Sequence, residues 1–386
     1  MNSQSQNPGQ LKKLNVFAII NPERTSGADM MLLDALRYLN PDQFQVILGL
    51  LTSNSQTRTL IPSHMAVKEF RMRQLNGIAW LRFFLYLCWH LASNKIELLH
   101  VNSYVPGNYA RLAAWLMRVP IIIDYWHGFT RFNRKRRLIC RLLDRFTDLS
   151  LAVSAGVRQH LLHQLEISPH KVRVLYNGID LKYIHNHRDR SEMRSILGIP
   201  ADEPVVGIVS RLDHWAKGHR ELFQALAQVR SHYPLRCLVI GGGRRQSQMA
   251  AMVQELSLTP RVTFLGHRDD IPDLLASLDI FVLPSHSEGI SRSLLEAMAS
   301  GLPVIVSEAG GSPEVVQHEV NGLLVPVKDA EALAQALIRL LSDPAQAKKL
   351  GLAAAEHVAA NFSLVRLGQE LNEIYLDLAS RQHLLD

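Results

Sequence analysis

The chain has 386 residues, of which 47% are hydrophobic and 20% are charged, and its formal net charge is +7. This length exceeds what one ordinary core organises, so we expect two domains, and the composition excludes a disordered or fibrous chain. The three cysteines, Cys88, Cys140 and Cys237, lie far apart and form no Cys-x-x-Cys pair, so neither a disulfide framework nor a zinc site is indicated. A reducing, cytoplasmic compartment is the simplest interpretation.

The first ten residues, MNSQSQNPGQ, are polar and have no apolar core. We expect them to be disordered rather than a signal peptide. The most apolar stretch, 77–92, contains Arg82 and His90 and is short for a membrane span, so we expect no transmembrane helix. Within it, residues 79–89 are expected to belong to the core rather than to a lipid-binding slot.

The charge is unevenly divided along the chain. Residues up to Asp180 contain 22 Lys and Arg against 11 Asp and Glu, whereas the remainder contains 20 against 24. The halves therefore carry +11 and −4, which sum to the +7 of the whole chain. A basic first half favours an anionic partner, such as nucleic acid, anionic lipid or an anionic acceptor.

Short β-branched runs alternate with helical patterns along the chain, which is typical of doubly wound α/β domains with parallel sheets. In the first half we expect strands at 14–20, 44–51, 65–70, 96–102, 119–126, 148–154 and 171–176. The turn signal NGID (177–180) interrupts this pattern. Strands are then expected at 204–210, 235–241, 261–266, 279–284, 303–307 and 322–326. We expect the domains to span 1–185 and 186–363, with a last helix, 364–386, that crosses back to the first.

Distinctive residues follow the expected strands of the second half. Ligands of such sheets bind beyond the carboxyl ends of the strands. Arg211 follows the first strand, glycines 241–243 follow the second, Gly266 and His267 follow the third, and the segment 285–291 follows the fourth. These strand ends predict one ligand site.

The segment SRLDHWAKGH (210–219) places Arg211 after a strand and Lys217 at the expected start of a helix. Two cations beside a helix N-terminus suit a diphosphate. Taken singly, each cation is more typical of an ordinary surface position. The combination at a strand end favours an anion site.

The segment SEGISRSLLEAMASG (287–301) reads as a capped helix, in which Ser291 is the N-cap, Gly301 ends the helix and Glu296 pairs with Arg292. That account leaves Glu288 unexplained. Gly289 permits close approach of a ligand, and the amides of Ile290 and Ser291 suit phosphate oxygens. A carboxylate at Glu296 could hold the vicinal hydroxyls of a ribose.

These segments resemble family 4 of the glycosyltransferases, the retaining enzymes with a GT-B fold. The resemblance covers most of the second half and rests on YNGID, SRLDHWAKG, VIGGG, FLGHRDDIPDLLASLDIFVLPS, EGISRSLLEAMASGLPVI and GGSPEVVQHEVNGLLVP. It implies two Rossmann-like domains facing across a cleft, the first binding the acceptor and the second a nucleotide-diphosphate sugar. It also implies diphosphate contacts from Arg211, Lys217, Gly289, Ile290 and Ser291, nucleoside contacts from Glu296, Gly266 and His267, and a donor-sugar contact from Glu288.

The resemblance is thinner in the first half. The segment DYWHGF (124–129) matches a His-Gly that follows a strand in the family, which implies that His127 lies beside the reacting centre. Without the family, a lone histidine at a strand end is more typical of a structural residue. Many members also carry a Gly-Gly pair after the first strand, whereas NPERTSGAD (21–29) offers only Gly27 near the donor.

The resemblance implies a retaining transfer to a hydroxyl of a glycan or lipid-linked acceptor, in the synthesis of a cell-surface polysaccharide or glycolipid. No Asp-x-Asp motif stands out, so we expect no metal and no other cofactor. Two alternatives stay open, a sugar-nucleotide epimerase on the same scaffold and a non-catalytic binding module. Nucleic acid is disfavoured as a partner because the basic stretch has no recognised module.

The stretch RFNRKRRLICRLLDRF (131–146) packs cations beside leucines. One interpretation is a solvated helix with one face in the core. The other is a helix on an anionic membrane surface, which would make the enzyme peripheral on the inner face of the membrane.

Overall fold

The structure is a computed structural model, and it describes residues 12–20, 27–52, 58, 60–70, 77–102, 104–130, 132–185 and 187–385. The expected disordered N-terminus lies outside these residues, as does most of the loop after the first strand. The chain divides into two compact units. Unit 1 comprises 1–153, 158–175 and 365–386, and unit 2 comprises 154–157 and 176–364.

Unit 1 is built on a parallel sheet of seven strands among the described residues, in the order β3-β2-β1-β4-β5-β6-β7. The strands are β1 (Leu14–Ile20), β2 (Phe44–Leu50), β3 (Ala66–Glu69), β4 (Leu98–Val101), β5 (Ile121–Trp126), β6 (Leu149–Ala152) and β7 (Val172–Val174). Strands β1, β4 and β5 are almost wholly buried, as expected for parallel strands with helices on both faces.

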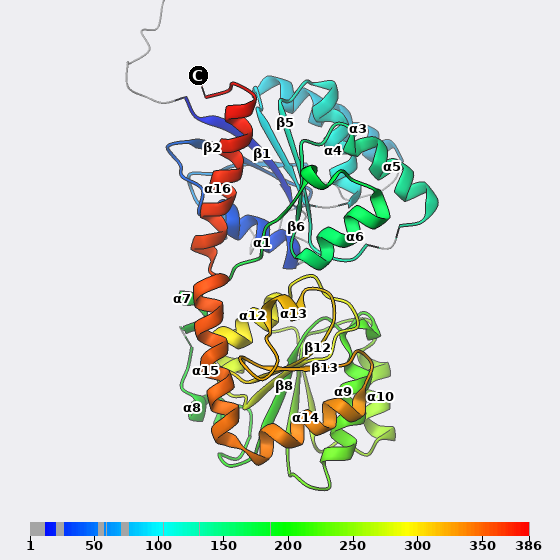
Figure 1. Ribbon diagram of the computed structural model, residues 1–386, viewed down its shortest axis with the longest axis vertical. Helices are drawn as coiled ribbons and strands as arrows, with labels where there is room; N and C mark the ends of the chain where they lie inside the picture. The colour runs from blue at the N-terminus through cyan, green and yellow to red at the C-terminus, as the bar shows by residue number, and fades with distance from the viewer. Residues whose placement is uncertain are drawn as a thin grey trace, which may run out of the picture. The chain divides into compact units, whose positions relative to one another are not determined.

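Helices cover both faces of this sheet (Figure 1). Helices α3 (Gly77–Ser93), α4 (Tyr104–Leu116) and α5 (Arg134–Asp144) lie on one face, and α1 (Gly27–Leu36) and α16 (Leu364–Arg381) on the other. The chain passes from β3 at one side of the sheet to β4 beyond β1, and right-handed crossovers then place the helices on opposite faces. Phe83, Leu87 and Leu91 of α3 join the core formed with β1 and β4.

The C-terminal helix α16 is part of unit 1 from Val365 onward. Its fully buried Tyr375 shares a 2.6 Å hydrogen bond with Nδ1 of His100 on β4. The ring of Tyr375 also packs edge-on against Phe44 of β2, with centroids 5.7 Å apart. These contacts fix the helix on the sheet.

Unit 2 contains a parallel sheet of six strands among the described residues, in the order β10-β9-β8-β11-β12-β13. The strands are β8 (Val205–Val209), β9 (Arg236–Ile240), β10 (Val262–Gly266), β11 (Ile280–Leu283), β12 (Val304–Ser307) and β13 (Leu323–Val325). The prediction of two doubly wound α/β domains is therefore confirmed, since each expected strand overlaps an observed one.

The helices of unit 2 follow its strands in chain order. They are α9 (His219–Val229), α10 (Gln246–Glu255), α11 (Ile271–Ala276), α12 (Arg292–Ala299), α13 (Ser312–Val315), α14 (Ala330–Ser342) and α15 (Pro344–Asn361), preceded by α7 (Leu181–His185) and α8 (Arg190–Ile196). Both α14 and α15 begin with Asp side chains that accept backbone N–H bonds, from Ala332 and Gln346 respectively.

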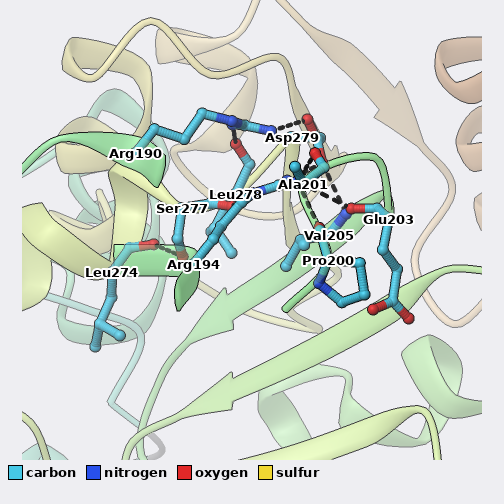
Figure 2. Close-up of polar contacts among 10 residues, drawn as sticks. All are labelled: Arg190, Arg194, Pro200, Ala201, Glu203, Val205, Leu274, Ser277, Leu278 and Asp279. Atoms are coloured by element: carbon cyan, nitrogen blue, oxygen red, sulfur yellow. Dashed lines mark hydrogen bonds and ion pairs between the residues drawn. The ribbon is translucent and has the colours of Figure 1, made fainter. Parts of the chain in front are cut away.

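A polar network anchors α8 to the sheet of unit 2 (Figure 2). The buried guanidinium of Arg194 donates to the carbonyl oxygens of Ser277 and Ala201, and it pairs with Asp279 at 2.7 Å. The same Asp279 carboxylate accepts the N–H of Val205 at 2.7 Å. The carboxylate and carbonyl oxygens compensate the desolvated guanidinium, and through Asp279 the network links α8 to the start of β8.

One expectation about helices is corrected. Helix α3 is not wholly in the core, because Ile78, Leu81, Leu85 and Trp89 are exposed. Helix α5 has one face in the core, as the first interpretation of 131–146 has it: Cys140 and Leu143 are buried, whereas Leu138 and Leu142 point outward at 60% and 48% exposure. No helix in the described part of the chain is long and apolar enough to span a membrane.

Candidate functional site

The carboxyl edge of the six-stranded sheet brings the predicted diphosphate and sugar residues together. In its strand order the connections run outward from β8 in one direction and from β11 in the other, so β8 and β11 flank the switch point at which such sheets bind ligands. The loop after β8 carries Arg211 and Lys217, and the loop after β11 carries Glu288 and Ser291.

Lys217 and Glu288 meet at this edge, with Nζ 2.5 Å from Oε2. Their side chains are 19% and 14% exposed, so solvent screens the pair only in part. The expectation that Lys217 opens a helix is wrong. It ends a short 3-10 turn, Trp215–Lys217, and α9 starts at His219 after Gly218. Gly218, between this turn and α9, has φ +76°, and a Cβ there would lie 1.9 Å from the Pro284 oxygen. Only glycine therefore fits at this junction.

Arg211 lies at the same edge and is largely exposed. Its side chain is 61% exposed, and its contact with Asp213 is a long one of 4.0 Å. Asp213 also receives the N–H of Arg244 at 3.2 Å. Arg211 is therefore an exposed, weakly paired cation, available to an anionic ligand.

Helix α12 begins as the sequence predicts. The Ser291 hydroxyl accepts the N–H of Leu294 at 3.4 Å, and Gly301 follows the last turn with φ +75°. Arg292 Nε donates to Glu296 Oε1 at 2.8 Å, which confirms the predicted pair. The Glu296 side chain is only 8% exposed, so a ribose that binds it would share the carboxylate with Arg292.

The loop between β11 and α12 is held by groups from distant parts of unit 2. The buried amide of Asn177, in the YNGID segment, donates to the Ile290 oxygen at 3.1 Å. The N–H of Gly311 donates to the Glu288 oxygen at 3.0 Å. A Cβ at Gly311 would lie 2.0 Å from the oxygen of Gly289, so only glycine permits this approach. The loop is thus preorganised before any ligand arrives.

A further side-chain contact at this edge, between Glu221 and His286, was not predicted from the sequence. Glu221 in the first turn of α9 places Oε1 3.0 Å from Nε2 of His286, two residues before Glu288. His286 also donates its N–H to the Ala216 oxygen at 2.8 Å, beside Lys217. The pair joins the loops that follow β8 and β11. The two residues are 65 positions apart in sequence, so no local spacing indicated the contact.

Gly266 ends β10 and His267 follows it, beside the carboxyl end of β9. Gly266 adopts φ +68°, and its oxygen accepts the N–H of Gly241 at 2.8 Å. His267 is exposed, at 3.6 Å from Asp269. Backbone rather than side chain therefore shapes this part of the edge, and the nucleoside role of both residues stays a prediction.

The corresponding edge of unit 1 holds a cavity of about 180 Å³ next to His127. Its walls come from the ends of β4 and β5 and from α4: Asn102, Arg111, Asp124, Tyr125, Trp126, His127, Gly128 and Thr130. Arg111 pairs with Asp124 at 2.8 Å, and both side chains are below 10% exposed. Burial raises the pKa of Asp124, and the adjacent Arg111 opposes that rise.

Neither ring nitrogen of His127 has a hydrogen-bond partner among the described residues. Burial lowers its pKa to about 3, so the ring is neutral near pH 7. Its imidazole packs on Tyr125, with centroids 4.1 Å apart. A neutral imidazole with two unpaired nitrogens can donate to one ligand atom and accept from another.

Asn102 follows β4, next to the switch point of unit 1 between β1 and β4. It is buried, and its amide donates to Asp29 at 3.2 Å. Gly27 is the exposed first residue of α1. The preceding loop residues lie outside the described chain, so the predicted donor contact of Gly27 stays a prediction.

Two family models match the chain. The model described as "Glycosyl transferases group 1" matches residues 189–357, and "Glycosyltransferase Family 4" matches residues 25–183. An N-acetyl-alpha-D-glucosaminyl L-malate synthase of Bacillus anthracis is 32% identical over 294 residues, 74% of this chain and 75% of the relative. A UDP-Gal:alpha-D-GlcNAc-diphosphoundecaprenol alpha-1,3-galactosyltransferase of Escherichia coli is 28% identical over 304 residues, 75% of this chain and 77% of the relative.

Solved structures have the same architecture. The structure of HepE from Anabaena in complex with UDP-glucose has a TM-score of 0.84 and 25% identity, and the match covers 94% of this chain and 100% of that one. The sucrose-phosphate synthase of Thermosynechococcus elongatus has a TM-score of 0.80 at 23% identity, and covers 96% of this chain and 100% of its own. The second likeness shows the shared fold.

Proposed function

The chain belongs to family 4 of the glycosyltransferases, and we propose that it moves a sugar, with retention, from a nucleotide-diphosphate donor to a hydroxyl of a glycan or lipid-linked acceptor. The observation that carries the donor assignment is the Lys217–Glu288 pair at the switch point of unit 2, beside the N-terminus of α12. The likeness to HepE, whose structure contains UDP-glucose, supports a UDP-sugar as the donor.

The diphosphate is assigned to the edge between β8 and β11. Arg211 and Lys217 supply positive charge, and the first N–H groups of α12 lack partners within the helix. When the diphosphate approaches Lys217, it competes with Glu288 for the ammonium group. Glu288 is then available to accept a hydroxyl of the donor sugar, which links donor binding to sugar positioning.

The reaction breaks the bond between the anomeric carbon and the diphosphate oxygen and forms one to the acceptor oxygen. The acceptor proton passes to an oxygen of the leaving diphosphate on the same face, which accounts for retention without a protein nucleophile. Negative charge builds on the diphosphate in an oxocarbenium-like transition state. Arg211, Lys217 and the amides of Ile290 and Ser291 stabilise it, and no metal or other cofactor takes part in this scheme.

His127 is assigned to the donor sugar near the reacting carbon. Because its pKa is about 3, it acts as a neutral hydrogen-bonding group and not as an acid. A neutral ring binds hydroxyls without repelling the positive charge that develops on the sugar. The two unpaired nitrogens provide the donor and the acceptor for this contact.

The acceptor site is assigned to unit 1, and the enzyme to the inner face of a membrane. The outward face of α5 carries Arg134, Lys135 and Arg141 around Leu138 and Leu142, which suits an anionic lipid surface. The diphosphoundecaprenol named for the Escherichia coli relative supports a lipid-linked acceptor. Transfer onto such an acceptor places the enzyme in cell-surface polysaccharide or glycolipid synthesis.

A thermal-shift screen of the purified chain against UDP, GDP, ADP and their sugar conjugates tests the donor site. A ligand at about 100 times its dissociation constant adds roughly 2.7 kcal/mol to stability. We expect one nucleotide family to raise the melting temperature, and we expect Arg211→Ala to reduce the rise. A well-folded sample that responds to none of them, in the presence or absence of acceptor lipid, overturns the proposal.

A further inference from the structure

Helix α3 of unit 1 exposes a row of large apolar side chains. Ile78, Leu81, Leu85 and Trp89 are 72%, 57%, 59% and 58% exposed. Their spacing of three, four and four residues puts them on one face of the helix, over about 16 Å at 1.5 Å per residue. An isolated exposed leucine needs no explanation, but a continuous row of four marks an interaction surface.

The fold of unit 1 does not require this row. The opposite face of α3 already buries Phe83, Leu87 and Leu91 in the core. Trp80 stacks on Tyr109 of α4, with centroids 4.9 Å apart. Polar side chains at the exposed positions would leave all of these contacts intact. The apolar residues therefore serve something outside unit 1.

Charge around the row favours an anionic surface. The helix, residues 77–93, contains no Asp or Glu, and its exposed face includes Arg82. At the other end the ammonium of Lys68 lies 5.1 Å from the centre of the Tyr86 ring. Tyr86 in turn contacts Trp89, with ring centroids 5.5 Å apart. A cation with Tyr and Trp at the border of an apolar row is the arrangement that side chains adopt at a lipid headgroup boundary.

Neighbouring helices extend this surface. Helices α3, α4 and α5 lie on the same face of the sheet (Figure 1). Exposed Trp115 and Leu116 end α4, and Leu138 and Leu142 project from α5 among its cations. Half of the twenty large apolar side chains that are exposed in the described chain lie on or next to these three helices, which concentrates them on one side of unit 1.

We infer that the exposed face of α3 inserts into the interface of an anionic lipid bilayer, with Ile78, Leu81 and Leu85 among the acyl chains and Trp89, Tyr86 and Lys68 at the headgroups. A second copy of this chain packed through the same face would add a second Arg82 and no carboxylate from the helix to pair with either, whereas lipid phosphates compensate this cation. The inference rests on the membrane contact proposed for α5 under the proposed function. It adds that α3 provides the apolar part of the contact between unit 1 and the membrane, while α5 provides the charged part.

Vesicle flotation of the full chain tests the inference, with phosphatidylcholine alone and with phosphatidylcholine mixed with phosphatidylglycerol. The double variant Leu81→Ser/Leu85→Ser is expected to weaken binding to mixed vesicles about tenfold or more, because two leucine side chains that insert among the acyl chains are lost. The matched control is Leu352→Ser, since Leu352 is 56% exposed on α15 of unit 2. It should bind as the wild type does.

Salt separates the role of α3 from that of α5. The variant Arg134→Gln/Lys135→Gln should lose about fivefold per cation, and the loss should shrink at high salt, where surface charges are screened. The loss caused by the α3 variant should persist at high salt. Vesicle binding that α5 substitutions weaken and α3 substitutions leave unchanged overturns the inference about α3 while the α5 contact survives. Absence of binding to either vesicle overturns both.

Two further readouts remove the remaining ambiguities. Lipids brominated near the headgroup should quench part of the tryptophan fluorescence of the wild type. This quenched part should be missing in Trp89→Phe, which would show that the Trp89 side chain inserts into the bilayer. A dimer that becomes monomeric in the α3 variant, with unchanged flotation, would instead identify a second copy of the chain as the partner. Sugar transfer to a soluble acceptor should be unchanged in the α3 variant. A failure of the proposed transferase activity and a failure of lipid binding are therefore measured separately.

Discussion

The carboxyl edges of the two units differ in charge. At the edge of unit 2 the largely buried Lys217–Glu288 ion pair and the Glu221–His286 contact lie beside the exposed Arg211. At the edge of unit 1 the Arg111–Asp124 pair is internally neutralised, and uncharged polar groups of the cavity have no hydrogen-bond partner among the described residues: the ring of His127, the Asn102 Oδ1 and the Trp126 Nε1. Unit 2 is thus suited to a polyanion, and unit 1 to hydroxyl groups.

The largest expected effect comes from removing the charged pair of unit 2. Lys217→Ala and Glu288→Gln should each lower kcat about 10²–10³-fold, because a preorganised group at the developing charge is lost from a partly desolvated site. Steady-state transfer from the donor identified by the thermal-shift screen measures this. Lys348→Ala, an exposed cation on α15, is the matched control. Wild-type turnover in both variants contradicts the assigned roles.

The next effect tests whether His127 works as a neutral group. His127→Ala should lower kcat about 10²-fold, the range of one lost hydrogen-bonding group in an active site. Because the pKa of His127 is about 3, the pH profile of the wild type should show no limb from this ring between pH 5 and 8. If the profile of the wild type has a limb near pH 6.5 that His127→Ala abolishes, the ring is charged and the comparison between the units fails.

Acid should destabilise unit 1 more than unit 2. Burial lowers the pKa of His100 and His127 to about 3 and that of His219 in unit 2 to about 4. The unfolded chain takes up protons below about pH 6.5, so stability falls as the pH drops from there toward the folded pKa. At pH 5 the fully buried His100 alone should cost about 2 kcal/mol relative to pH 8.

Hydrogen exchange of β4 and β8 peptides at pH 8 and pH 5 measures this difference. The protection factors, which correct for the slower intrinsic amide exchange at pH 5, should fall more in β4 than in β8 on acidification. His100→Gln should remove about 2 kcal/mol of the acid sensitivity in unit 1 and leave β8 unchanged. An equal fall in the protection factors of both peptides, unaffected by the substitution, would show that buried histidines do not distinguish the units.

The smallest effect sharpens the account of the nucleotide site. Glu296→Gln should weaken nucleotide binding about tenfold while the fold is kept, because an amide replaces a charged acceptor of ribose hydroxyls. The control is Arg292→Gln, which tests the salt bridge without removing the carboxylate. Calorimetric titration with the nucleotide that raises the melting temperature gives both constants. A tenfold loss with Arg292→Gln alone would mean that the salt bridge, not the ribose contact, matters.

The strand pattern was readable from local sequence because parallel strands buried on both faces are short apolar runs between turn signals. The cap at Ser291, the end of α12 at Gly301 and the Arg292–Glu296 pair were predictable for the same reason, since capping and the four-residue spacing act within one helix. The candidate donor residues could be named because they follow successive strands, and parallel strands end at one edge.

Contacts between residues far apart in sequence were decided only by the tertiary structure. The Glu221–His286 pair joins residues 65 positions apart, and the 3-10 turn before α9 depends on Pro284 lying against Gly218. The exposed row on α3 was invisible for another reason. A helix that is apolar all round gives no periodic signal to show which side meets the sheet, and only its packing on β1, β4 and α4 leaves Ile78, Leu81, Leu85 and Trp89 outside.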